Sequence, residues 1–366
     1  MEKSNIVMFY PFISPEAKDE LMRTLDSRWI GQGPRVDRFE RAFAEKFEIP
    51  DDYRAVALNS GSSALDTAID LLDLGPGDEV ITTPLTCTAT NIPLLRKGVR
   101  LVFADIDPST LCLSAEDLVS KITAKTKAIT NVHLGGIEND LSFVEEQFNI
   151  PVIDDCAQAI GIFTKVSFSC YSFQAIKTLT TGDGGMLVCN NAEAAHTAKL
   201  LRWFGIDRDV KRAARWQPYV AREITHDIER LGHKRQMTDL AAALGLGGLK
   251  AYDRIIAARE AIFDIYRDIR TPGFRLVDAA PGKKNVYWLA TAIVDRRDAF
   301  VEKLQGHGIE TNTVHVRNDI YRIFGGNRHN LPVMNDLEES YISIPIHNHM
   351  TTDDAFYIRK AIEEGW

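Results

Sequence analysis

The stretch RAVALNSGSSALDTAIDLLDLGPGDEVITT, residues 54–83, contains in order a strand, a turn, a helix and a second strand. Residues 54–59 form a short apolar run typical of a strand, and residues 62–74 repeat apolar side chains at helical spacing. A turn rich in glycine and serine joins them, and residues 79–83 begin the next strand. This order predicts a strand–helix–strand unit of an α/β protein.

The same alternation continues to about residue 190. Further strands are predicted at residues 100–106, 127–132 and 150–155, and helices between them at residues 114–122 and 141–148. We therefore expect a mostly parallel sheet flanked by helices. Ligands of such sheets bind at the carboxyl ends of the strands, so the polar residues after each apolar run are the candidates for a site.

Beyond residue 190 the pattern becomes mainly helical, and from about residue 272 short strands and helices mix. We expect a large domain at residues 13–250 and a smaller α+β C-terminal domain at residues 251–366. Residues 1–12 are expected to pack against the smaller domain. The charged stretch at residues 206–236 is expected to form an exposed loop.

Composition limits the kind of protein. Of 366 residues, 45% are hydrophobic and 26% are charged, as is typical of a soluble globular chain. The net charge of −8 argues against nucleic acid or an acidic membrane as partner. The five cysteines are odd in number and widely spaced, which favours a reducing, cytoplasmic location and no metal site.

A lysine in unusual surroundings suggests the chemistry. Lys177 lies in the hydroxyl-rich stretch SFQAIKTLTTGDGG, residues 172–185, and Asp155 ends the predicted strand before it. A lysine amine condenses with an aldehyde, and an aspartate can keep a pyridine nitrogen protonated. The turn at residues 59–63 opens a helix and could hold a phosphate. Each feature alone also fits a surface lysine, a capping acid or a plain turn, but their order predicts a pyridine cofactor.

These residues lie in motifs that resemble a known family. The chain is similar to the DegT/DnrJ/EryC1/StrS sugar aminotransferases, which depend on pyridoxal phosphate (PLP) and have the aspartate aminotransferase fold, fold type I. The resemblance covers nearly the whole chain and includes NSGSSAL, GPGDEVITTPLTCTATN and GIETNTVHVRNDIY. Its highly specific part is the lysine motif SFQAIKTLTTGDGGML together with VIDDCAQA.

The resemblance implies a role for each matching residue. Lys177 would bind the cofactor covalently and move the proton, and Asp155 would pair with the ring nitrogen. Gln158 would contact the ring or its hydroxyl. The phosphate would be held by Ser62, Ser63 and Ser172.

Several positions depart from the family pattern, among them Cys87, Lys234 and Gln236, which replaces an arginine of the family. Cys87 lies where an aromatic residue usually stacks on the cofactor ring, so the stacking surface is expected to be thinner. Lys234 lies where the family commonly has an asparagine that reaches the phosphate of the partner subunit. A lysine there can still neutralise a phosphate as a point charge.

The substrate contacts are also implied by resemblance. Trp29 and the polar residues of VHVRND, namely His315, Arg317 and Asn318, match positions near the sugar or its diphosphate. For Trp29, simple packing is an equal alternative. His133 is either near the sugar or a structural hydrogen-bonding residue.

We therefore expect a transaminase that moves an amino group from L-glutamate to a nucleotide-linked 4-keto- or 3-keto-6-deoxyhexose, with pyridoxamine phosphate (PMP) as the intermediate form. It would act in amino-sugar biosynthesis for lipopolysaccharide, glycan or antibiotic, as a homodimer with shared active sites. The alternatives are a keto-cyclitol or unactivated keto-sugar as acceptor, a PMP-dependent sugar dehydratase, and a regulatory protein that kept the fold. Lys177 argues against the dehydratase, whose family members carry histidine there.

Overall fold

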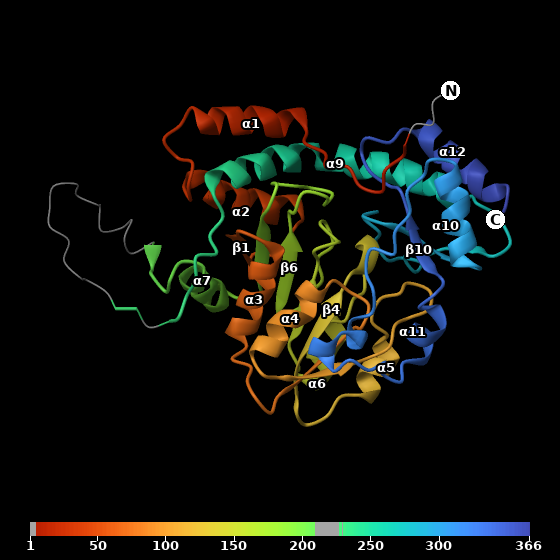
Figure 1. Cartoon of the computed structure of the whole chain (residues 1–366). Coiled ribbons are helices and arrows are strands. Elements are labelled where there is room, and N and C mark those ends of the chain that lie inside the picture. The colour runs from red at the N-terminus through yellow and green to blue at the C-terminus, as the bar shows by residue number, and fades with distance from the viewer. Residues whose placement is uncertain (1–4, 209–226, 229) are drawn as a thin grey trace.

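The computed structural model describes residues 5–208, 227–228 and 230–366 (Figure 1). Most of the stretch expected to be an exposed loop, residues 206–236, therefore lies outside the described residues. No helix in the described part of the chain is both long enough and apolar enough to cross a bilayer.

A seven-stranded sheet forms the centre of the larger part, in the order β1-β7-β6-β5-β4-β2-β3. Its strands are β1 (Arg54–Leu58), β2 (Glu79–Thr82), β3 (Arg100–Phe103), β4 (Thr126–Val132), β5 (Val152–Asp155), β6 (Phe168–Ser172) and β7 (Gly185–Cys189). The pairs from β3 to β6 are all parallel, and only β7 runs antiparallel to its neighbours β1 and β6. The predicted mostly parallel sheet is confirmed.

Helices cover both faces of this sheet (Figure 1). The helices of this larger part are α1 (Pro15–Leu25), which packs against α9, and α2 (Pro34–Lys46), α3 (Gly61–Leu71), α4 (Thr88–Arg96), α5 (Ala115–Ser120), the 3-10 helix η1 (Leu134–Gly136), α6 (Ser142–Phe148), α7 (Ala192–Leu201) and α9 (Asp239–Arg267). Apolar side chains of α3 and α7 pack with one core cluster, and those of α2 and α9 pack with another. Burial on both faces explains why the strands are nearly continuous apolar runs.

The C-terminal part contains a three-stranded antiparallel sheet. Its elements are β8 (Phe274–Leu276), β9 (Ala290–Val294), α10 (Arg297–Gly306), η2 (Asn318–Ile320), η3 (Arg322–Phe324), α11 (Pro332–Leu337), β10 (Tyr341–Ile344) and α12 (Thr352–Glu363). Its core includes the end of α9, which runs across from the main sheet (Figure 1). The expected division at residue 250 falls inside this helix and stays a prediction.

The N-terminal segment lies against the C-terminal part. The backbone N–H of Ile6 donates to the carbonyl of Gly308 over 2.9 Å, and that of Met8 donates to Glu310 Oε2 over 2.9 Å. Ile6 is buried in the same core as β9 and β10. This segment also brings Phe9 to the wall of the cavity described below.

Candidate active site

A cavity of about 420 Å³ opens at the carboxyl ends of β5 and β6. It is lined by residues from the main sheet, from the N-terminal segment and from the C-terminal part. The predicted site residues that it brings together are Ser62, Cys87, Asp155, Gln158, Ser172, Lys177 and His315. These residues come from separate motifs that span most of the sequence. The fold brings them together around one cavity.

Lys177 lies in the turn after β6, where its backbone N–H donates to the carbonyl of Gln174 over 2.9 Å. Its side chain is half-buried and faces the cavity, with Nζ 3.6 Å from the centre of the Trp288 ring. Burial lowers the pKa of the amine to about 8, against the attraction of Asp155. A substantial neutral fraction, which is the nucleophilic form, is therefore present near neutral pH.

Asp155 is the last residue of β5 and is buried at the cavity wall. Thr90 Oγ1 donates to its Oδ2 over 2.7 Å, and the N–H of Ala157 donates to its Oδ1 over 3.0 Å. Burial raises the pKa of this carboxyl, against those hydrogen bonds and the charge of Lys177. A cationic ring nitrogen placed in the cavity would favour the charged carboxylate.

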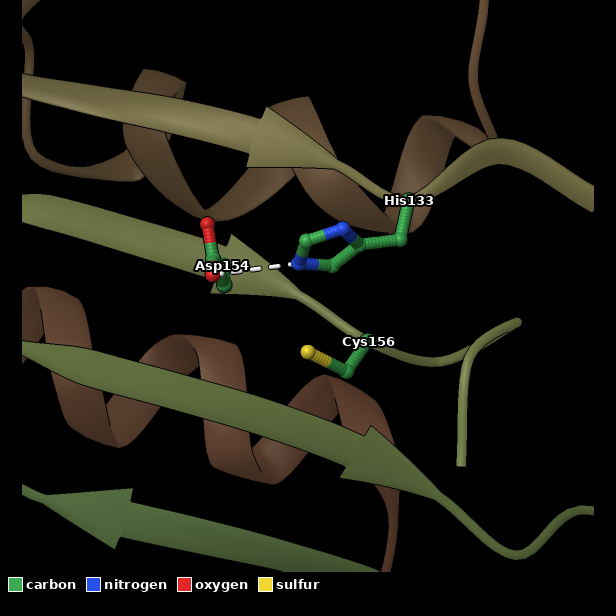
Figure 2. Close-up of side chains that lie close together, drawn as sticks. All are labelled: His133, Asp154 and Cys156. Atoms are coloured by element: carbon green, nitrogen blue, oxygen red, sulfur yellow. Dashed lines mark ion pairs between the residues drawn. The ribbon is translucent and has the colours of Figure 1, made fainter. Parts of the chain in front are cut away.

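His133, Asp154 and Cys156 form a buried polar cluster (Figure 2). His133, Asp154 and Cys156 offer ligand-type atoms within 4.8 Å of one another. His133 Nε2 lies 3.0 Å from Asp154 Oδ2, as a close ion-pair contact without hydrogen-bond alignment, and Nδ1 accepts from the N–H of Asn139. Burial opposes the charge of His133, but Asp154 outweighs it and raises the histidine pKa. Both ring nitrogens are thus engaged within the protein, which fits the structural alternative for His133.

The start of α3 approaches Ser172 closely. A Cβ placed on Gly61 would lie 2.6 Å from the Cβ of Ser172, so only glycine fits there. Ser62 and Ser172 both line the cavity at this point. The hydroxyl of Ser63 instead donates to Asn59 Oδ1 over 2.7 Å, and its side chain is not part of the lining.

Gln158 and His315 are joined across the cavity wall. The Gln158 Oε1 accepts from the N–H of Gly135 over 2.7 Å, which leaves its Nε2 to donate to His315 Nε2 over 3.0 Å. Burial lowers the pKa of His315 to about 4, and the charge of Lys177 acts in the same direction. His315 is therefore a neutral imidazole at neutral pH.

Arg317 and Asn318 are fully buried behind the lining of the cavity. The guanidinium of Arg317 pairs with Asp319 over 2.6 Å and with Glu338 over 3.1 Å. The Asn318 side chain donates to the carbonyl of Thr86 over 2.8 Å. In this structure both side chains brace the segments that carry His315 and Cys87.

Trp29 and Lys234 also lie outside the lining. Trp29 is 42% exposed, in the loop before α2. Lys234 is exposed. Its carbonyl accepts from the side chain of Asn59 over 3.4 Å, and Asn59 directly precedes Ser60, the N-cap of α3. Their predicted substrate and phosphate contacts stay predictions.

Sequence reasoning missed Trp288 and Thr90. Trp288 is 2% exposed and presents its ring to Lys177, while its Nε1 donates to the carbonyl of Ile176 over 3.1 Å. Thr90 holds Asp155 from α4. Trp288 lies in an apolar stretch and Thr90 in a threonine-rich one. Nothing in these stretches indicates that Trp288 contacts Lys177 or that Thr90 contacts Asp155.

Comparison with known proteins places this site in a family. The sequence profile of the DegT/DnrJ/EryC1/StrS aminotransferase family matches residues 11–363. The chain belongs to this family. It is 30% identical to the dTDP-4-dehydro-2,3,6-trideoxy-D-glucose 4-aminotransferase of Saccharopolyspora spinosa, over 84% of this chain and 83% of that one.

Solved structures agree over the whole length. AtS13 from Actinomadura melliaura superposes with a TM-score of 0.90 and 33% identity, covering 100% of both chains. The putative sugar aminotransferase Spr1654 from Streptococcus pneumoniae, solved in a PMP form, gives a TM-score of 0.88 and 26% identity over 98% of each chain. The predicted fold type I and membership of the aminotransferase family are confirmed.

Family members use PLP, and the residues of this cavity fit that cofactor. Asp155 is a buried carboxylate facing the cavity, Lys177 is a half-buried amine with a lowered pKa, and the close approach of Gly61 to Ser172 forms a small polar cradle. The carboxylate suits the ring nitrogen of PLP, the amine suits its aldehyde, and the cradle suits its phosphate. The cofactor of this sugar aminotransferase is therefore PLP.

Proposed function

We propose that the enzyme transfers the amino group of L-glutamate to a nucleotide-linked 4-keto- or 3-keto-6-deoxyhexose. The observation that carries the proposal is the meeting of Lys177 and Asp155 in one cavity. The S. spinosa relative, whose name gives a dTDP-linked 4-dehydro sugar as substrate, supports a nucleotide-linked keto-sugar as acceptor. Amino-sugar biosynthesis in the cytoplasm is the setting that fits this reaction.

Each residue has a separate task in this proposal. When bound, PLP withdraws electrons from the carbon that carries the nitrogen, which makes a proton on that carbon acidic. Lys177 takes that proton with its amine and returns it. Asp155 holds the ring nitrogen in its charged form, while Ser62, Ser172 and the N–H groups at the start of α3 bind the phosphate.

The sugar would enter on the side of the cavity formed by the C-terminal part. His315 lines that side and is neutral; because its Nε2 accepts from Gln158, its Nδ1–H remains to donate a hydrogen bond without adding charge. Arg317 and Asn318 act from behind by holding the segment that carries His315. Trp29 is assigned to the outer part of the substrate, such as the nucleotide.

We infer in addition a homodimer in which Lys234 reaches the phosphate of the partner subunit. Its exposed position beside the start of α3, outside the cavity of its own subunit, supports this assignment. Mixing two inactive variants, Lys177→Ala and Lys234→Ala, and letting subunits exchange should restore part of the activity. No restoration in dimers that have demonstrably exchanged subunits would contradict shared sites.

The reaction itself is tested with a panel of acceptors. The PLP-loaded protein is incubated with L-glutamate and nucleotide-linked keto-sugars, keto-cyclitols and free keto-sugars, while 2-oxoglutarate and product mass are followed. We expect 2-oxoglutarate and an amino sugar only with a nucleotide-linked keto-deoxysugar. Turnover of keto-cyclitols or free sugars alone would replace the acceptor class and leave the transaminase assignment intact.

A further inference from the structure

The ring face of Trp288 lies against the amine of Lys177. Lys177 Nζ lies 3.6 Å from the centre of the indole ring, well inside the range of a cation–π contact. Trp288 is 2% exposed, so water does not weaken this contact from the far side of the ring. Such contacts are strongest on tryptophan and where the cation is desolvated.

The indole is also fixed relative to the turn that carries the lysine. Its Nε1 donates to the carbonyl of Ile176, the residue before Lys177, over 3.1 Å. Rings of Phe9 and His315 stack beside it at centroid distances of 6.0 Å and 6.2 Å. The ring therefore cannot tilt away from Lys177 without breaking contacts on three sides.

The backbone that presents Trp288 is strained and held from several directions. Tyr287 has a φ of 54°, a left-handed conformation that is unfavourable for a residue other than glycine. Its hydroxyl donates to Glu260 over 2.8 Å, and its carbonyl accepts from the buried Arg259 over 3.1 Å. The N–H of Leu289 donates to the carbonyl of Gly135 over 3.0 Å. Such a held strain is typical of a functional position.

A transaminase lysine needs a place for its free amine. In the proposed role, on which this inference rests, the amine of Lys177 would be free while substrate is bound, and it would become an ammonium when it takes the proton. We propose that Trp288 is a positioning residue for Lys177, and that its ring face receives and orients the released ammonium. The same contact stabilises the charged form against burial.

A matched pair of variants isolates the ring face. Trp288→Phe and Trp288→Leu both lose the indole N–H and part of the side-chain volume, but only phenylalanine keeps an aromatic face. The other ionisable side chains that line the cavity among the described residues are Cys87, Asp155 and His315, and both variants leave them unchanged. A difference between the two variants therefore reports on the face of the ring.

The readout is the amine of the cofactor-free protein. PLP is added at a series of pH values, and the rate at which the visible absorbance band appears gives the midpoint for the neutral amine. Loss of a cation–π contact favours the neutral form, so the midpoint of Trp288→Leu should lie about half to one and a half pH units below that of Trp288→Phe. Trp288→Phe should stay nearer to the native protein in this midpoint and in kcat.

Equal midpoints and equal kcat values in folded Trp288→Phe and Trp288→Leu would overturn the proposal. If Trp288→Leu does not fold, as judged by circular dichroism, Trp288→Met makes the same comparison. Lys177→Ala separates this test from the proposed function, because it should form no band at all. A band in Lys177→Ala would remove Lys177 as the cofactor lysine, whatever the Trp288 variants show.

Discussion

Thr90 Oγ1 donates a hydrogen bond to Asp155 Oδ2 over 2.7 Å, and both residues are buried. Thr90→Val keeps the shape of the side chain and removes the donor. The carboxylate then loses a bond that favours its charged form, so its pKa should rise further and its hold on the ring nitrogen should weaken. We expect PLP to bind roughly ten-fold more weakly, measured by titration of the cofactor-free protein.

Thr90→Ser is the control for this change. It keeps the hydroxyl and loses a methyl group, so its PLP affinity should stay close to that of the native protein, with only a small loss of thermal stability. If Thr90→Val bound PLP as tightly as Thr90→Ser, the hydrogen bond would have no role in holding the cofactor.

Lys177 should reduce the stability of the cofactor-free protein. Its pKa is about 8 in the folded chain against a usual 10.5, so the unfolded state binds more protons between these values. The penalty is fully present below pH 8 and disappears as the pH rises towards 10.5. Lys177→Met should therefore raise the free energy of unfolding at pH 7 by at most about 3 kcal/mol, since the half-buried side chain keeps some contact with water.

Urea denaturation of the cofactor-free protein at several pH values measures this gain. The exposed Lys165 is a matched control, because Lys165→Met should change stability by less than about 0.5 kcal/mol. A gain for Lys177→Met that stays constant up to pH 10.5 would show that the cause is packing and not charge.

Much of this architecture could be predicted from local pattern. Strands buried on both faces are apolar runs, and helices such as α3 show amphipathic spacing, so their order reveals a parallel α/β sheet. The strands β6 and β7 were not predicted, and the antiparallel direction of β7 depends on its connection and not on its composition. α4 was also missed, since its sequence lacks an amphipathic stripe and contains Pro93.

The role of a site residue could be predicted only where a single short motif contains that residue. Lys177 and Asp155 lie in short specific motifs and reach the same cavity. The contact of Lys177 with Trp288 joins residues from distant parts of the chain, and no local pattern encodes it. Likewise, nothing in VHVRND shows that its arginine turns away from the cavity to pair with the aspartate two residues later.

Arg317 provides a test of the bracing role. Its side chain is fully buried, and Arg317→Met would leave the buried Asp319 without its ion-pair partner, while Glu338 would keep Arg328. Breaking a buried pair in this way costs about 3–5 kcal/mol of unfolding free energy, measured by urea denaturation. Arg328 pairs with the same Glu338 from the surface, so Arg328→Met should cost less than about 1 kcal/mol. Equal losses for the two variants would refute the bracing role.

His315 should make the protein sensitive to acid. Its pKa is about 4 in the folded chain, mainly through burial, against 6.5 for an exposed histidine. Between these values the unfolded state binds the extra proton, so acidification from pH 6.5 to 4 should weaken the fold through this residue by at most about 3 kcal/mol. His315→Gln cannot be protonated, and its free energy of unfolding should fall less steeply over the same range. Subtracting the two curves removes the contributions of His133 and His347, which both proteins share. Parallel curves would mean that folding does not lower the pKa of His315, and burial would then not be what keeps this proposed contact to the sugar neutral.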